Sequence, residues 1–218
     1  MSLTRSEQLF EDFCQTKRIR CVRIGTGSSR TPDYEIFVPR RKLVVEIKEI
    51  SSNREELDAQ RRARAGEFVV VSSTPGQRVR GKISDAVPQI KMRAKGRFPG
   101  LLVLMDTGFA AEHTSPYNIR VAMHGFETLV YAVPRDPSYS PYVTDQKFGG
   151  SRKMTLNSNT SISAIAVIGH INGNLDFRVY HNPHAAIPLQ PTVFHRYQVP
   201  QYALAPHTPG SIPDWAQV

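Results

Sequence analysis

The stretch from Thr31 to Ile50 places the strongest limits on how this chain can fold. Two runs within it, 33–38 and 42–50, are rich in branched apolar residues, and Pro39 separates them at a position that suits a turn. Such a pattern predicts a β-hairpin. In each strand, successive side chains are expected to alternate between the two faces.

The predicted hairpin brings two acidic residues together. With the turn at Pro39 and Arg40, Asp33 is expected opposite Glu46, with their Cβ atoms about 5 Å apart. Lys48 is expected one pleat further along the same face. Neighbouring carboxylates repel each other, and a shared proton or a bound Mg²⁺ relieves the repulsion. A lysine beside them would orient or deprotonate a water that attacks a phosphodiester. The alternative is a half-buried strand with an ordinary salt bridge on one face.

The residues Pro32-Asp33, followed after twelve residues by Glu46-Ile47-Lys48, resemble the motif of the PD-(D/E)xK nuclease superfamily. This group includes restriction endonucleases, recombination exonucleases and Holliday junction resolvases, and the spacing is similar to that of the resolvase-like branch. The resemblance implies that Asp33, Glu46 and the Ile47 backbone carbonyl bind Mg²⁺, for which Mn²⁺ substitutes, and that Lys48 is catalytic. It also implies a restriction-endonuclease-like αβββαβ core with a mixed central sheet.

Residues 5–16 are predicted to form an amphipathic helix. Thr4 and Glu7 have the spacing of a capping box, and apolar residues recur at helical intervals. In the superfamily the first helix often carries a glutamate that reaches the metal. The resemblance therefore adds Glu7 as a candidate catalytic residue, with Glu11 as the less favoured choice. The structural alternatives are a helix cap for Glu7 and a solvent-facing position for Glu11.

A polar, glycine-rich loop joins the first predicted strand, 19–25, to the aspartate. In the resolvase-like branch small hydroxylated residues lie near the scissile phosphate, and backbone N–H groups of glycine-rich turns bind anions. The loop is not a Walker A motif, because no Gly-Lys-Ser/Thr follows. A simple connecting loop is the alternative. The candidate nucleic-acid contacts in this loop are Ser28, Ser29 and Arg30.

The hairpin is followed by elements in the order that the resemblance implies. Continuous apolar runs indicate buried strands, and an internal proline is expected to kink or interrupt a helix. The segment 134–153 is predicted to be a loop. The alternative is a nucleic-acid contact, in which its interleaved aromatic and basic residues stack bases and hold phosphates, namely Tyr139, Tyr142, Lys147, Arg152 and Lys153. The predicted elements are a helix over 52–66, a strand over 68–72, a helix over 82–95 that contains Pro88, a strand over 101–105, and an added C-terminal β segment with strands over 162–168 and 175–180 joined by Asn172-Gly173-Asn174.

The excess positive charge lies in the first part of the chain. Residues 1–97 contain 21 Lys and Arg against 12 Asp and Glu, whereas residues 98–218 contain seven of each. A basic surface around a candidate metal site favours partners that carry phosphate. The basic run Lys91, Arg93 and Lys95 is therefore a further predicted nucleic-acid contact. Its alternative is a solvated helix end with cations near its C-terminus.

Composition and termini predict a cytoplasmic protein without membrane association. No apolar run approaches the ~20 residues of a membrane span, and acidic residues occupy the start where a signal peptide would be apolar. Two cysteines do not make a disulfide framework. Residues 1–182 are expected to form a nuclease-like domain. Residues 183–218 are rich in proline and are expected to wrap over it or to be partly disordered.

The sequence therefore predicts a Mg²⁺-dependent deoxyribonuclease of α/β fold that acts on DNA. RNA stays open as a substrate, and a homodimer is compatible with the pattern. The alternative is a catalytically weak or inactive nuclease-fold module that binds nucleic acid or a protein partner.

Overall fold

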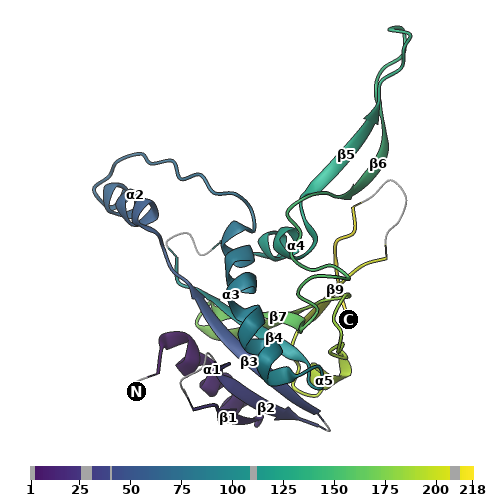
Figure 1. Cartoon of the computed structure of the whole chain (residues 1–218). Coiled ribbons are helices and arrows are strands. Elements are labelled where there is room, and N and C mark those ends of the chain that lie inside the picture. The colour runs from purple at the N-terminus through teal and green to yellow at the C-terminus, as the bar shows by residue number, and fades with distance from the viewer. Residues whose placement is uncertain (1–2, 26–30, 40, 109–111, 207–211) are drawn as a thin grey trace.

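The structure, a computed structural model, describes residues 3–25, 31–39, 41–108, 112–206 and 212–218. Over these residues helices lie on both faces of one large mixed sheet, and a separate two-stranded hairpin projects from it (Figure 1). The predicted α/β class with a mixed central sheet is confirmed.

The central sheet has eight strands within the described residues, in the order β1-β2-β3-β4-β7-β8-β9-β10. The first three strands form an antiparallel meander, and β4 and β7 then continue parallel to β3. β8 runs antiparallel to β7, β9 is parallel to β8, and β10 is antiparallel to β9. The strands of the sheet are β1 Arg20–Arg23, β2 Tyr34–Val38, β3 Arg41–Ile50, β4 Gly100–Asp106, β7 Ile162–Ile171, β8 Asn174–His181, β9 Gln201–Leu204 and β10 Trp215–Gln217.

Five helices occur in the same ranges. The first begins after Thr4, whose predicted capping box with Glu7 is present. The third starts earlier than predicted and continues through Pro88, which was expected to kink or interrupt it. The helices are α1 Arg5–Thr16, α2 Arg54–Arg64, α3 Gln77–Ala94, α4 Pro116–His124 and α5 Thr192–His195.

The β2–β3 hairpin forms with the predicted turn. Val38 pairs with Arg41 and Tyr34 pairs with Val45, so that Pro39 lies in the connection. All residues from 43 to 47 are buried. The reason is the place of β3 inside the sheet, between β2 and β4, with helices above and below it. A polar side chain that points from this strand is therefore removed from water.

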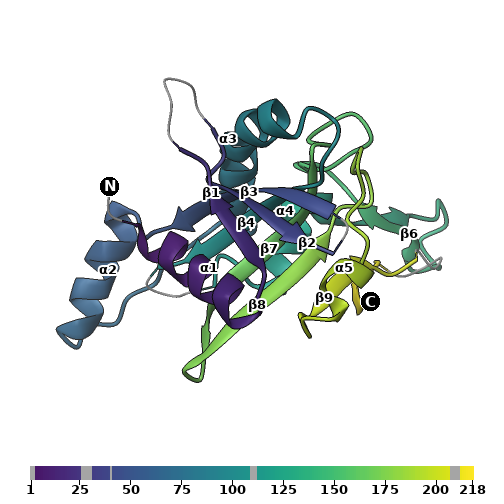
Figure 2. The ribbon, with the colours of Figure 1, turned by 90° about the horizontal axis from the view of Figure 1, so that it is seen from below.

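Two apolar cores lie on opposite faces of the sheet. On one face Phe10 and Phe13 of α1 pack on the strands, and the Phe13 ring stacks on Phe177 of β8 with a centroid separation of 4.0 Å. On the other face Ile83 and Ile90 of α3 are fully buried, together with residues of α4. Figure 2 shows α1 lying across the sheet on the side opposite α3. Val44 and Val45 of β3 belong to different cores, as strand alternation requires.

Two segments project from the sheet (Figure 1). Helix α2 buries only Glu56 and Ala59. The hairpin of β5, Glu127–Ala132, and β6, Tyr142–Phe148, forms a two-stranded sheet of its own. The predicted loop over 134–153 is therefore partly wrong. The middle of β6 is a continuous polar run, residues 144–147, and most side chains of the strand are exposed. The strand therefore lacks the alternating apolar residues that would identify it in a sequence.

The buried strand predicted at 68–72 is wrong. These residues lie outside any helix or strand, and Phe68 and Val70 are 90% and 79% exposed. The place beside β3 is taken by β4, whose residues from Gly100 onward pair with β3 in parallel. An apolar run becomes a strand only where a sheet edge is open to it, and that edge is occupied.

Residues after 160 complete the sheet. The predicted β7–β8 hairpin is confirmed, and Asn172 and Gly173 both have positive φ, as a two-residue turn of this kind requires. After it, Phe194 of α5 is fully buried, and β9 and β10 extend the sheet. Within the described ranges, no helix has the length and apolar character needed to cross a bilayer.

Candidate active site

Asp33 lies directly before β2, where the ladder between β2 and β3 ends. Its N–H donates to the Val45 carbonyl at 3.1 Å, although Val45 also pairs with Tyr34. Asp33 therefore continues the contact with β3 by one residue beyond the paired segment, which ends at Tyr34. Pro32 has no N–H with which to continue the ladder. The Asp33 carboxylate takes that place, and its Oδ2 accepts the Ile47 N–H at 2.7 Å.

The register of the paired residues agrees with the predicted turn, and the difference concerns only the contacts of Asp33, which lies beyond the ladder. The sequence places Asp33 opposite Glu46, whereas the backbone of Asp33 bonds to Val45 and its carboxylate lies against the Ile47 amide. Turn geometry alone does not fix the contacts of Asp33, because this residue lies beyond the last pair of the ladder. The Asp33 carboxylate nevertheless lies beside the segment that carries Glu46.

Glu46 and Lys48 share one face of β3, as predicted, and form an ion pair. Lys48 Nζ lies 2.5 Å from Glu46 Oε1. Glu46 is completely buried, whereas the Lys48 side chain is 24% exposed. Apart from this ion pair, neither Glu46 carboxylate oxygen has a hydrogen-bond partner among the residues that the structure describes. Burial of a carboxylate whose contacts are limited to one ion pair reduces the free energy of unfolding.

The two carboxylates influence each other electrostatically. Burial raises the pKa of Glu46 to about 7, against the favourable effect of Lys48, and the nearby charge of Asp33 raises it further. Burial also raises the pKa of Asp33, although the Ile47 N–H and the Lys48 charge lower it. Acids of this kind retain protons more readily than usual or exchange them for a cation. Asp33, Glu46 and Lys48 thus belong to one site.

The oxygen atoms of this site fit Mg²⁺. The bond to Ile47 uses one Asp33 oxygen and leaves the other, and Glu46 Oε2 is buried without a partner in the described structure. The N–H and C=O of a strand residue point to the same neighbour, so the Ile47 carbonyl faces the Asp33 side. Mg²⁺ typically binds one or two carboxylates and keeps several waters. Over the described residues, no cluster of three or more His, Cys, Asp or Glu suits a metal.

Glu7 lies beside the site with both oxygens engaged. Its Oε2 accepts the Thr4 N–H at 2.7 Å, and its Oε1 accepts from Arg23 at 2.8 Å. Burial raises the pKa of Glu7, but the Thr4 hydrogen bonds and the Arg23 charge together hold it below its ordinary value. Both Glu7 and Arg23 affect the pKa of Asp33. Helix α1 and strand β1 therefore place an ion pair next to Asp33.

Two residues that lie near the site are not predicted from the sequence to be site residues. Arg23 is an exposed strand residue with nothing in the local pattern to mark it, and only the β1–β2 pairing brings it close to Asp33. Gln89 of α3 donates to the Thr31 carbonyl at 3.4 Å, just ahead of the Pro32-Asp33 pair. Glu11 is directed elsewhere, since it accepts from the Tyr34 hydroxyl at 2.8 Å.

The basic run does not form a single patch. Arg93 lies 2.7 Å from Glu35 of β2, which also pairs with Lys42 at 2.9 Å. Lys91 and Lys95 are exposed and lie one helical turn apart, away from the Arg93 side of α3. The predicted contacts that fall outside the described residues are Ser28, Ser29 and Arg30.

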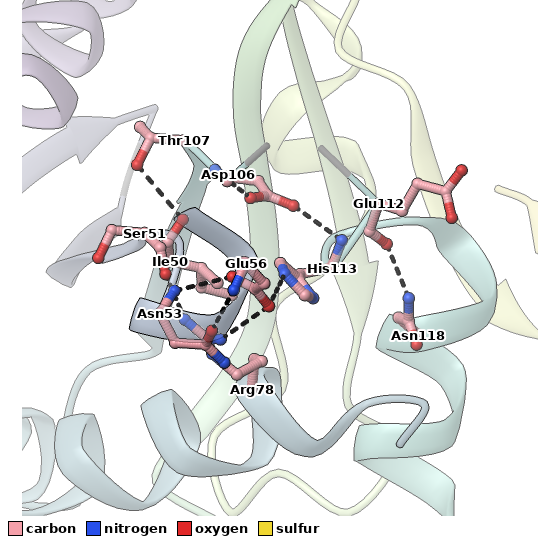
Figure 3. A network of polar contacts seen from close by, with 11 residues as sticks. Ile50, Ser51, Asn53, Glu56, Arg78, Asp106, Thr107, Glu112, His113 and Asn118 are labelled. Carbon is pink, nitrogen blue, oxygen red and sulfur yellow. Dashed lines mark hydrogen bonds and ion pairs between the residues drawn. The ribbon is translucent and has the colours of Figure 1, made fainter. Parts of the chain in front are cut away.

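A second polar network lies at the carboxyl ends of β3 and β4 (Figure 3). Glu56, in the first turn of α2, pairs with Arg78 of α3 at 3.2 Å and with His113 Nε2 at 3.3 Å. Asp106 accepts the N–H groups of Gly108 at 2.9 Å and of His113 at 2.8 Å. These polar groups are one another's hydrogen-bond and ion-pair partners. The network therefore explains how the projecting α2 is anchored to the sheet.

No family model, curated protein or solved structure matches this chain.

Proposed function

We propose that this chain is a Mg²⁺-dependent nuclease of the PD-(D/E)xK type that hydrolyses phosphodiester bonds in DNA. The observation that carries the proposal is a buried, partly unsatisfied Glu46 carboxylate beside Asp33 and Lys48. A divalent cation would neutralise both carboxylates and complete the contacts of Glu46. The order α1, β1, β2, β3, helices, β4, with β4 parallel to β3, supports the restriction-endonuclease-like core that the motif implies.

In this proposal Asp33, Glu46 and the Ile47 carbonyl hold the ion. When bound, Mg²⁺ acts as a Lewis acid and lowers the pKa of a coordinated water. Lys48 contacts both the buried carboxylate and solvent, because about a quarter of its side chain is exposed. It orients the attacking water, which displaces the leaving oxygen directly, without a covalent enzyme intermediate. Asp33 stays aligned through its bond to the Ile47 amide.

Positive charge on the neighbouring helices supports a polyanionic substrate. Helix α2 begins shortly after Lys48 and carries four exposed arginines, Arg54, Arg61, Arg62 and Arg64. Two of them are paired with exposed acids at 2.7–3.0 Å, and such surface pairs exchange readily for phosphate contacts. DNA would therefore approach along α2 and the exposed lysines of α3.

One observation favours a second candidate, a nuclease-fold module that binds nucleic acid or a protein partner without cleaving. Glu46 has no exposed surface, and its ion-pair partner Lys48 lies at a short distance. If this ion pair persists, the carboxylate is closed to a metal and the site is a buried salt bridge.

The test is metal binding and cleavage by the full chain. The protein is incubated with Mg²⁺ or Mn²⁺ and a panel of duplex, single-stranded, circular and branched DNA, with RNA alongside. Lys48→Ala and Glu46→Gln remove the proposed chemistry. Lys42→Ala is the matched control, since Lys42 lies on the same face of β3 and also pairs with a buried glutamate, Glu35.

The proposal requires Mn²⁺ binding that Glu46→Gln abolishes, and cleavage that Lys48→Ala loses and Lys42→Ala retains. Salt-dependent DNA binding without metal binding or cleavage would support the second candidate, a nuclease-fold module that binds without cleaving. Equal activity of Lys48→Ala and the wild type would remove Lys48 from the mechanism.

A further inference from the structure

A pocket of about 310 Å³ lies far from the Asp33–Glu46 site. It is lined by residues from the end of α4, the base of the β5–β6 hairpin and the segments around β9. The residues that matter are His124, Lys147, Phe148, Arg152, Met154 and His184. Four strand spacings separate β3 from β9 in the sheet, or about 19 Å. The pocket is therefore separate from the proposed catalytic site.

The inner wall of the pocket carries an unsatisfied imidazole. His124 is 5% exposed, and its Nε2 has no hydrogen-bond partner within the described residues. Its ring lies between the rings of Phe148 and Trp215, with centroid separations of 5.8 and 5.6 Å. Burial, with smaller effects of His184 and Arg120, lowers the pKa of His124 to about 3. The ring is therefore neutral near pH 7, and a buried polar nitrogen without a partner costs free energy that a ligand group would recover.

The remaining lining residues combine cations with apolar surface. Arg152 is exposed and has no ion-pair partner among the described residues, and Lys147 is 56% exposed with a loose contact of 3.4 Å to Asp145. The described lining contains no carboxylate. Phe148 and Met154 supply the apolar part. The pocket thus offers an apolar interior, one hydrogen-bonding ring nitrogen and two cationic side chains.

We propose that this pocket binds one nucleoside monophosphate unit. The base would lie in the apolar interior beside Phe148 and Met154, with a base edge or sugar hydroxyl toward His124 Nε2, and Arg152 and Lys147 would hold the phosphate. An aromatic ring suits a cavity wall of Phe and Met, and a phosphate suits guanidinium and ammonium groups. The volume is at the low end for ligand sites, which favours a single nucleotide.

Two kinds of ligand contain a nucleoside monophosphate unit, a free nucleotide and the phosphorylated end of a nucleic-acid strand. The proposal does not rest on nuclease activity, because binding is measured in EDTA, where no Mg²⁺-dependent cleavage occurs. Trp215 is the single tryptophan of the chain and its ring contacts His124, so its fluorescence reports occupancy of the pocket.

The experiment titrates the full chain with AMP, GMP, CMP and UMP, then with adenosine and with inorganic phosphate. A short oligonucleotide with a terminal phosphate, and the same oligonucleotide without it, form the second arm. Arg152→Glu is the test variant, and Arg135→Glu, an exposed arginine near the tip of the same hairpin, is the matched control. Both residues are exposed, so folding is expected to survive and is checked by circular dichroism.

We expect at least one mononucleotide to bind about tenfold more tightly than adenosine or phosphate, and Arg152→Glu to weaken it about tenfold while Arg135→Glu does not. Binding only of the phosphorylated oligonucleotide, with the same dependence on Arg152, would identify a strand end as the source. Equal binding of phosphate and nucleotides would indicate a general anion patch and overturn the proposal. Absence of binding in both arms would also overturn it, as would binding by Arg152→Glu that is as tight as binding by the wild type.

Discussion

The buried Glu46 carboxylate predicts an unusual dependence of stability on pH. In the metal-free protein, burial raises the pKa of Glu46 from an ordinary 4.5 to about 7. Between these values the folded protein retains a proton that the unfolded chain has released. The free energy of unfolding therefore falls as pH rises through this window, by about 3 kcal/mol in total. The stabilising contribution of the retained proton is fully present below pH 4.5 and is lost as pH rises through 7.

Glu46→Gln isolates this contribution, since glutamine keeps the shape and cannot ionise. At pH 8 the variant should be more stable than the wild type by up to about 3 kcal/mol, and near pH 4 the two should be similar. Urea denaturation in EDTA, followed by circular dichroism at several pH values, measures the difference. Glu55→Gln, an exposed position on α2, is the matched control.

Mg²⁺ provides the second half of the test. If the ion binds between Asp33 and Glu46, MgCl₂ at about 100-fold its Kd should stabilise the wild type at pH 8 by about 3 kcal/mol, and Glu46→Gln should lose most of this gain. Parallel pH curves for the wild type and Glu46→Gln would refute the reasoning about burial. If the stability curves of the wild type and Glu46→Gln differ with pH as expected but MgCl₂ has no effect, the result would support the buried carboxylate and reject the metal site.

Four further changes test other parts of the structure. Lys48→Ala should lower the cleavage rate about 10²–10⁴-fold, as expected for loss of a general acid or base, with DNA affinity in filter binding nearly unchanged. Replacement of the whole basic run by alanine should flatten the dependence of DNA affinity on salt, and an unchanged slope would make it a solvated helix end. Gly100→Ala should destabilise the fold by about 1–3 kcal/mol in urea, because an added Cβ would lie 2.3 Å from the Ser161 carbonyl. Gly81→Ala, with open space around it in α3, should instead stabilise by about 1 kcal/mol, and equal effects of the two glycine changes would contradict the packing described.

Features set by neighbours in the chain could be read from the sequence. The capping box of α1 depends on Thr4 and Glu7, three residues apart. The turn at Asn172-Gly173 depends on two residues that tolerate positive φ. The shared face of Glu46 and Lys48 depends only on strand alternation, and the ion pair between them follows from it. In each case the interacting groups lie within a few positions, so the pattern contains the whole interaction.

Features that depend on distant partners required the tertiary structure. The apolar segment at 68–72 has strand-like composition, but β4 occupies the sheet edge beside β3, and Phe68 is left exposed. The contacts of Asp33 with β3 and the approach of Arg23 arise from pairing between strands. Strand alternation predicts the face of β3 to which Glu46 belongs. The complete burial of Glu46 depends on β2, β4 and α3 together. Burial and charge environment are sums over the whole fold, and for this reason the sequence indicated which residues form the candidate site while the fold decided their electrostatic state.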